Sequence, residues 1–173
     1  MGCDIHAYSE IKKYGWEFKG AVSSNRDYVF FGLIAGVRKP EIKIYDAKGF
    51  PENASIKSKA IYDLWSGDAH SASFLTLAEL KAIDKSKMIK ISGMMDREQL
   101  KKCKADFAAG NYDSEHLYPY CQGTNITTHE HFELEMPVIS KTNSVQNWIE
   151  ELEKIKPADA TDEQVRVVFF FDN

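Results

Sequence analysis

Long apolar runs and a disulfide pattern are both missing from this sequence. It contains three cysteines, Cys3, Cys103 and Cys121, and an odd number at scattered spacing does not form a disulfide framework. No apolar run reaches the roughly 18 residues that a membrane span requires. The first residues also lack the basic flank and apolar segment of a signal peptide. We therefore expect a cytoplasmic protein with no membrane partner.

Signature motifs of several enzyme classes are absent as well. The chain has no GxxxxGK[ST], GxGxxG, HExxH, CxxC or GxSxG motif, which excludes the usual P-loop NTPases, dinucleotide-binding folds, zinc proteases, zinc ribbons and serine hydrolases. An excess of positive charge is missing too, since the formal net charge is −4. This balance argues against broad nucleic-acid binding through phosphate neutralisation.

The composition that is present is typical of a folded globular protein. The chain is 43% hydrophobic and 28% charged, which separates it from disordered sequences. Its 173 residues suffice for a substantial core, and no internal repeat of 20–50 residues divides them. We therefore expect a single globular domain over residues 1–173.

The sequence patterns near both ends of the chain predict strands. Residues 3–12 alternate between apolar and polar side chains, and Gly15 in the following turn precedes a second strand over 16–22, which predicts a hairpin. Residues 165–171 are almost continuously apolar, as expected of a strand covered on both faces. This last strand is expected to be central and to pair with the first.

Helical signals and further strands fill the interval between these ends. Asn25 or Asp27 is expected to cap a helix that Pro40 stops, and Thr76 with Glu79 forms a capping box before another helix. The remaining expectations are strands at 41–45 and 126–138, a helix over 97–110 capped by Asp96, a long loop over 111–126, and an amphipathic helix from 143 or 144 to 155. The fold class is therefore α+β, with a mainly antiparallel sheet, an N-terminal hairpin, a central C-terminal strand and helices packed on the sheet.

A repeated D-x-H pattern is the first candidate site. It occurs as Asp4-Ile5-His6 and as Asp68-Ala69-His70, and residues i and i+2 of a strand share one face. Two carboxylates and two imidazoles suit one divalent Zn, Mn or Fe ion, with Asp172 as a fifth ligand if the last strand lies beside the first. Such a metal would activate water for phosphoester hydrolysis. The alternative is that these are solvated strand and turn residues.

Two further features indicate anion binding. In SGDAHSAS, His70 and Ser71 stand among small residues whose backbone N–H groups can cradle a phosphate without metal. Arg26 precedes the expected first helix and can clamp a phosphate or carboxylate. The alternatives are an ordinary turn before the helix capped by Thr76, and an arginine that pairs with Asp27 or Asp172.

His129, His131 and Cys3 are weaker candidates. The two histidines share their strand face with Glu133 and Glu135, which is typical of a solvated face. Cys3 and His6 lie on opposite faces of a strand, so they do not form a nucleophile–base pair. Cys3 is expected to be a small core residue.

Five blocks of the sequence carry a resemblance to known proteins. MGCDIH, RDYVFFGLIAGVR, GFPENAS, GDAHSASFLTLAEL and VRVVFFFDN cover about half of the chain. As a set they resemble small bacteriophage and prophage proteins that begin MGCDIH and end in a VFFFDN-like strand. The resemblance implies a phage-type accessory protein in the host cytoplasm and implies no particular activity. The resemblance adds Asn173 to the candidate ligand-binding residues. It also places most of the other candidates within the recurring blocks, namely Cys3, Asp4, His6, Arg26, Asp27, Asp68, His70, Ser71 and Asp172.

Two functions stay open from the sequence. The first is a metal-dependent hydrolase of a nucleotide or other phosphoester, in which Asp4, His6, Asp68 and His70 are catalytic. The second is a non-catalytic protein that sequesters a small nucleotide signal or inhibits a host defence protein. In the second case His70, Ser71 and Arg26 contact the ligand, and Asn173 is a further ligand-binding candidate. The arrangement of the carboxylates discriminates between them, because hydrolysis requires Asp4 and Asp68 to lie close together with both histidines.

Overall fold

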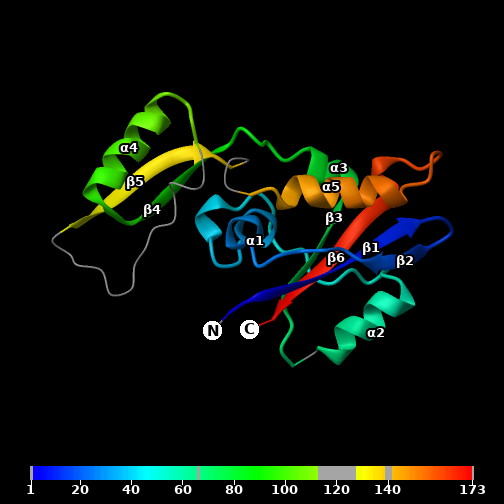
Figure 1. The fold of residues 1–173 in the computed structure, drawn as a ribbon. Helices are drawn as coiled ribbons and strands as arrows, with labels where there is room; N and C mark the ends of the chain where they lie inside the picture. The colour runs from blue at the N-terminus through cyan, green and yellow to red at the C-terminus, as the bar shows by residue number, and fades with distance from the viewer. Residues whose placement is uncertain (1, 66, 113–127, 139–141, 173) are drawn as a thin grey trace. The chain divides into compact units, whose positions relative to one another are not determined.

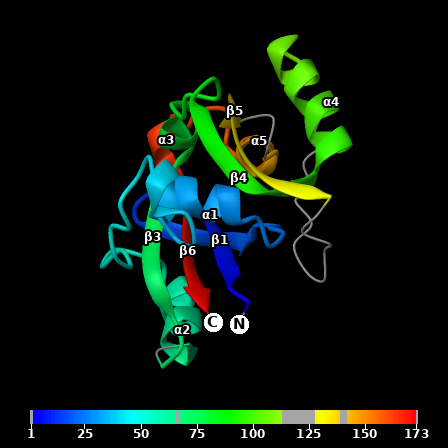
Figure 2. The same ribbon diagram turned by 90° about the vertical axis from the view of Figure 1, so that its left-hand side faces the viewer.

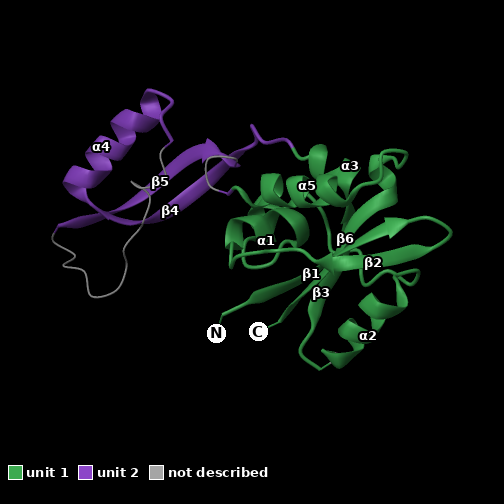
Figure 3. Ribbon diagram, turned by 45° about the vertical axis from the view of Figure 1, so that its right-hand side comes forward, with its two compact units in different colours: residues 1–83, 143–173 green, residues 84–142 purple. Residues whose placement is uncertain are grey.

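The computed structural model describes residues 2–65, 67–112, 128–138 and 142–172. They form two compact units, one from residues 1–83 and 143–173 and the other from residues 84–142 (Figure 3). The expectation of a single domain over residues 1–173 stays a prediction.

A four-stranded sheet organises the first unit. Its strands are β1 (Asp4–Lys12), β2 (Trp16–Ala21), β3 (His70–Thr76) and β6 (Val165–Asp172), in the order β2-β1-β6-β3. All neighbouring strands are antiparallel. The structure thus confirms the α+β class, the N-terminal hairpin and the central position of the last strand beside the first (Figure 1).

Helices of the first unit cover both faces of this sheet (Figures 1 and 2). They are α1 (Tyr28–Ala35), α2 (Ile56–Leu64), α3 (Leu77–Lys81) and α5 (Ser144–Ile155), with 3-10 turns η1 (Pro40–Ile42) and η4 (Asp162–Gln164).

The aromatic contacts of β6 show which helix covers which face. Phe171 packs on Phe31 of α1 and Phe169 on Trp148 of α5, whereas Phe170 packs on Tyr62 of α2. Successive strand residues point to opposite faces, so α1 and α5 lie on one side of the sheet and α2 on the other. This double coverage explains why the apolar run in β6 is almost unbroken.

Helix α1 begins at the predicted cap but ends before the predicted stop. The Asp27 carboxylate accepts hydrogen bonds from the backbone N–H groups of Val29 and Phe30. The helix ends at Ala35 because Gly36 adopts a left-handed conformation, with φ of 70°, which glycine tolerates at no steric cost. Pro40 therefore does not stop the helix.

The prediction of a strand over residues 41–45 is wrong. Residues 40–42 form the turn η1 instead, and the backbone N–H groups of Ile44 and Tyr45 both donate to the carbonyl of Leu33. These bonds tie the segment to the end of α1. They leave neither N–H group for a strand ladder.

The second unit consists of a two-stranded antiparallel sheet and one helix. Strands β4 (Met88–Asp96) and β5 (His129–Pro137) pair with each other, and α4 (Arg97–Ala108) follows the Asp96 cap. The predicted helix and the predicted strand are confirmed, whereas β4 was not predicted. Of the loop expected over 111–126, residues 113 onward lie outside the described residues, as does Cys121.

The alternating pattern of β5 agrees with a half-solvated strand. Phe132 and Met136 are buried, while His131, Glu133 and Glu135 are exposed. This arrangement explains the polar face without a metal site. Across the described residues, none of the helices combines the length and apolarity needed to cross a bilayer.

Asp27 links two helices, and its removal should destabilise the protein. Besides capping α1, its carboxylate accepts a hydrogen bond of 2.8 Å from the hydroxyl of Ser144, at the start of α5. Loss of an N-cap costs about 0.5–2 kcal/mol, so Asp27→Ala, which also loses the bond to Ser144, should lower the free energy of unfolding by about 1 kcal/mol or more in a urea titration. Asn25→Ala, at the exposed alternative cap position, is the matched control. An equal or larger loss in the control would contradict the assignment.

Candidate functional site

The first unit gathers most of the candidate residues at one end of its sheet. Strand β1 begins, β6 ends and β3 begins at this end because the neighbours are antiparallel. Asp4 lies opposite Asp172, and His70 lies opposite Phe171. We call the polar and small residues gathered there the strand-end cluster, and they are Gly2, Cys3, Asp4, His6, Arg26, Arg38, His70, Ser71 and Asp172.

Asp172 connects the two terminal strands within this cluster. Its Oδ1 accepts a hydrogen bond of 3.2 Å from the backbone N–H of Asp4, and its Oδ2 lies 3.3 Å from Nε2 of His6. The His6 ring lies against Trp65 and Phe170, at centroid distances of 4.2 and 4.9 Å. Carboxylate and aromatic rings together fix the orientation of the imidazole.

Arg26 binds Asp4, rather than the expected Asp27 or Asp172. Its Nε and Nη2 donate to the two carboxylate oxygens of Asp4 at 2.9 and 2.6 Å. The hydrogen bonds from Arg26 hold the pKa of Asp4 below its ordinary value. Both side chains are about half exposed, so water screens the pair and its contribution to stability is small.

A second arginine approaches the same N-terminal residues. Nη2 of Arg38 donates to the carbonyl oxygen of Gly2 at 3.4 Å. Burial raises the pKa of the Cys3 thiol, and a hydrogen bond from Arg38 offsets only part of that rise. Cys3 is 1% exposed, so it is a protonated core residue and not a nucleophile.

The second D-x-H pair does not lie on a strand as expected. Asp68 is an exposed residue of the turn after α2, and its backbone N–H donates to the carbonyl of Trp65 at 2.9 Å. Only His70 belongs to β3. Residues 67–69 form a turn because the chain leaves α2 and reverses there before it enters the sheet.

The strand register also separates the two histidines. His70 lies opposite Phe171, whereas His6 lies opposite Phe170. Neighbouring residues of β6 point to opposite faces, and directly paired residues share a face. His6 is therefore on the α2 side of the sheet and His70 on the α1 side. The carboxylates and imidazoles of the two pairs do not converge from one face.

His70 and Ser71 show local irregularities that are typical of functional positions. Nδ1 of His70 lies 3.1 Å from the hydroxyl of Ser71, but its buried Nε2 has no hydrogen-bond partner among the described residues. Ser71 has φ of 48°, and the β3–β6 register is irregular from His70 to Ser73. Strained backbone and unsatisfied polar atoms concentrate where proteins contact ligands.

The metal hypothesis receives no support from a ready ligand set. Within residues 2–65, 67–112, 128–138 and 142–172, no group of three or more His, Cys, Asp and Glu residues is arranged to hold a metal ion. Arg26 occupies both carboxylate oxygens of Asp4. Metal ligation by Asp4, His6, Asp68, His70 and Asp172 stays a prediction, and Asn173 lies outside the described residues.

A buried ion pair on the α2 side was not predicted from the sequence. Nε of Arg166 on β6 donates to Oε2 of Glu10 on β1 at 2.8 Å, and the two residues are only 2% and 0% exposed. The Arg166 guanidinium also lies 3.7 Å from the ring centroid of Trp16. The sequence did offer one signal of this pair: Arg166 is the only charged residue in the otherwise apolar run of residues 165–171, and a buried charge requires a partner.

This ion pair also fastens the GFPENAS segment to the sheet. The backbone N–H of Ser55 donates to Oε1 of Glu10 at 2.8 Å, and Nη1 of Arg166 donates to Oδ1 of Asn53 at 3.0 Å. The polar residues of this segment therefore satisfy buried charges. Their role in the described structure is to hold the loop that leads into α2.

Removal of one member of the buried pair should strongly destabilise the protein. Glu10→Gln leaves the Arg166 charge buried without its anionic partner, which costs about 3–5 kcal/mol. Urea titration should show this loss, and Glu10→Gln/Arg166→Met should recover much of it because no uncompensated charge remains. Glu17→Gln, which breaks the exposed pair with Lys19, is the control and should unfold like the wild type. A Glu10→Gln variant as stable as that control would refute the network's importance.

The same pair predicts acid sensitivity. Burial by itself would raise the pKa of Glu10, but hydrogen bonds from Ser55, Ser58 and Arg166 outweigh it, and the pKa is lowered. A lowered folded-state pKa contributes stability that is fully present above the unfolded pKa, about 4.3 for glutamate, and is lost as the pH falls through the folded value. Thermal unfolding from pH 7 to pH 2 should therefore show a steeper loss below about pH 4.3 in the wild type than in Glu10→Gln. Parallel pH profiles would contradict this.

Comparisons with known proteins add no identification to this geometry. No protein family, curated protein or solved structure matches the chain.

Proposed function

We propose that this protein binds a small phosphorylated molecule of the nucleotide class at the strand-end cluster, without catalysis, as a phage-type accessory protein in the host cytoplasm. The observation that carries the proposal is that the half-exposed Arg26 binds Asp4, which shares one face of β1 with His6, and that the His6 ring lies against Trp65. A cation and an aromatic surface side by side are what a phosphate joined to a base requires. The separation of the two D-x-H pairs weakens the hydrolase alternative.

Arg26 is suited to receive the phosphate. Its planar fork binds the carboxylate of Asp4 through two hydrogen bonds, and phosphate oxygens fit the same fork. Water screens this exposed pair, so little stability is lost when Arg26 changes partner. A phosphate that carries two negative charges attracts the guanidinium more strongly than a carboxylate does. Asp4 therefore acts as a competitor that an incoming phosphate displaces.

Trp65 and His6 are suited to receive the base. Trp65 is only partly buried, and its ring lies 4.2 Å from that of His6 at an interplanar angle of 38°. Nucleobases stack on such aromatic faces with little dependence on the base. Asp172 holds His6 in place, so the surface is formed before the ligand arrives.

The His6–Asp172 contact favours phosphoester hydrolysis as a second candidate function. A carboxylate that orients an imidazole is the arrangement of a general base. In this case His6 would deprotonate water and Arg26 would stabilise the phosphate charge. A Zn, Mn or Fe ion held by the predicted ligands would serve the same reaction by activating water.

Nucleotide binding provides the direct test of the proposal. Titration calorimetry with nucleoside mono-, di- and triphosphates and cyclic nucleotides should give saturable binding. Arg26→Ala should weaken it about tenfold or more, because a bidentate charge-assisted contact is lost. Asp4→Asn should strengthen it, because the competing carboxylate is removed. Lys19→Ala, an exposed cation elsewhere on the sheet, is the control. No binding, or equal affinity in Arg26→Ala, would overturn the proposal.

Metal removal separates binding from hydrolysis. The purified protein should contain less than one equivalent of Zn, Mn or Fe by elemental analysis, and EDTA treatment should leave nucleotide affinity unchanged. Product analysis by chromatography should detect no turnover. Turnover that is lost in His6→Ala would instead establish the hydrolase. If no nucleotide binds and a host protein is captured from lysate, inhibition of a host defence protein replaces both functions.

A further inference from the structure

Helix α2 exposes an apolar stripe on the side that faces away from the sheet. Ile56, Ala60 and Leu64 recur at every fourth position, and residues with this spacing share one helix face. Ile56 is 89% exposed and Leu64 is 85% exposed. On the opposite side of the helix Ser58 is buried and Tyr62 stacks on Phe50. We call Ile56, Ala60 and Leu64 the outer stripe.

Two opposite charges lie along one flank of the outer stripe. Lys59 and Asp63 are both exposed and are four residues apart, so they lie on the same side of the stripe. Among the described residues, neither side chain forms an ion pair. The surface therefore presents an apolar centre with one cation and one anion beside it.

We infer that the outer stripe binds a second copy of this chain, with the two α2 helices antiparallel about a two-fold axis at Ala60. This register places Ile56 against the partner's Leu64 and Leu64 against the partner's Ile56. Ala60 faces its own copy, and its small side chain lets the helix backbones approach closely. A two-fold interface must be complementary to itself, and this stripe meets that condition because its two large apolar residues are equidistant from Ala60.

The flanking charges fit the same arrangement. In an antiparallel pair related by a two-fold axis, equivalent flanks of the two helices face each other. Lys59 then lies two residue rises, about 3 Å, along the axis from both the partner's Asp63 and the partner's Lys59. Because helix side chains tilt toward their own N-terminus, each Lys59 side chain leans toward the partner's Asp63 and away from the partner's Lys59, and the symmetric contact forms once more. The helix dipoles are also antiparallel, so each N-terminus lies beside the partner's C-terminus. Charge and shape therefore select a second copy as the occupant of this surface.

The size of the stripe sets the strength of the association. One helix of nine residues buries less than the roughly 1,200 Å² of a standard interface. The dimer is therefore weak and depends on protein concentration. Sedimentation velocity should show conversion of monomer to dimer as the protein concentration rises from about 10 µM to about 1 mM, because weak complexes have Kd values in this range.

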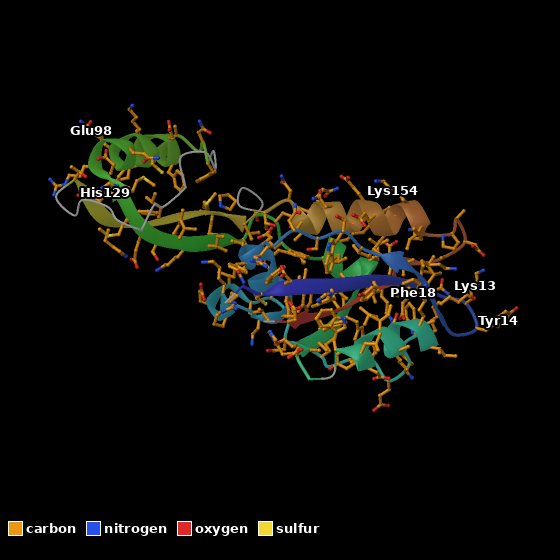
Figure 4. All side chains as sticks on the ribbon, turned by 60° about the horizontal axis from the view of Figure 1, so that its bottom comes forward. Lys13, Tyr14, Phe18, Glu98, His129 and Lys154 are labelled. Atoms are coloured by element: carbon orange, nitrogen blue, oxygen red, sulfur yellow. The ribbon has the colours of Figure 1, made fainter. Side chains whose placement is uncertain are left out.

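An apolar substitution and its control test the stripe. Leu64→Glu should keep the protein monomeric up to the highest concentration, because it places a charge in the apolar centre. Tyr14→Glu is the control, since Tyr14 is a fully exposed aromatic residue at the turn of the β1–β2 hairpin (Figure 4), and it should dimerise like the wild type. Both variants should keep the wild-type thermal unfolding curve. A wild type that is monomeric throughout, or a Leu64→Glu variant that dimerises, would overturn the inference.

A charge exchange tests the antiparallel register itself. Lys59→Glu alone carries only acidic flanking residues and Asp63→Lys alone carries only basic ones, so each should dimerise at least about tenfold more weakly than the wild type. An equimolar mixture of the two variants should restore the dimer, because every flanking contact then joins opposite charges. A mixture no better than its components would show that Lys59 and Asp63 do not meet across the interface. That result would refute this two-fold arrangement.

Discussion

The burial of β6 on both faces is the constraint on which the first unit depends. From Val165 to Phe171 every residue is buried, and consecutive phenylalanines pack on opposite layers. Because one strand supplies the apolar surface for both layers, α1 and α5 must lie on one side and α2 on the other. Within the sheet, β6 lies between β1 and β3. The first and the last strand of the chain are therefore its two central strands.

This central position has an electrostatic consequence at each end of β6. At its start, Arg166 is buried and must be neutralised by Glu10 and by the oxygen of Asn53, so a loop is held over the α2 side of the sheet. At its end, Asp172 reaches the partly exposed rim, where it binds the Asp4 backbone and His6. The buried pair stabilises the fold, whereas the partly exposed groups can still exchange partners. This contrast in burial is why the ligand is proposed at one end of the strand and not at the other.

Much of the fold could be predicted from local sequence signals. The alternation in residues 3–12, the Thr76–Glu79 capping box and the amphipathic repeat of α5 each act over a few residues, and each predicts an element that the structure contains. The first helix was predicted with Asn25 or Asp27 as its cap, and the structure selects Asp27. The strand expected at 41–45 failed because its N–H groups bond to Leu33, a contact that no local pattern reveals. Strand β4 was missed because it acquires its pairing only from β5.

The candidate site shows the same division between sequence and tertiary structure. The sequence by itself determined which chemical groups are available, namely Asp4, His6, Arg26, His70 and Asp172, and that the last strand is buried. Only the tertiary structure decided which of them meet, because the β1–β6 register places Asp172 beside His6 while the alternation of β6 sends His70 to the other face. Side-chain chemistry is a property of each residue, but convergence is a property of strand register and coverage, which depend on contacts between residues far apart in the chain.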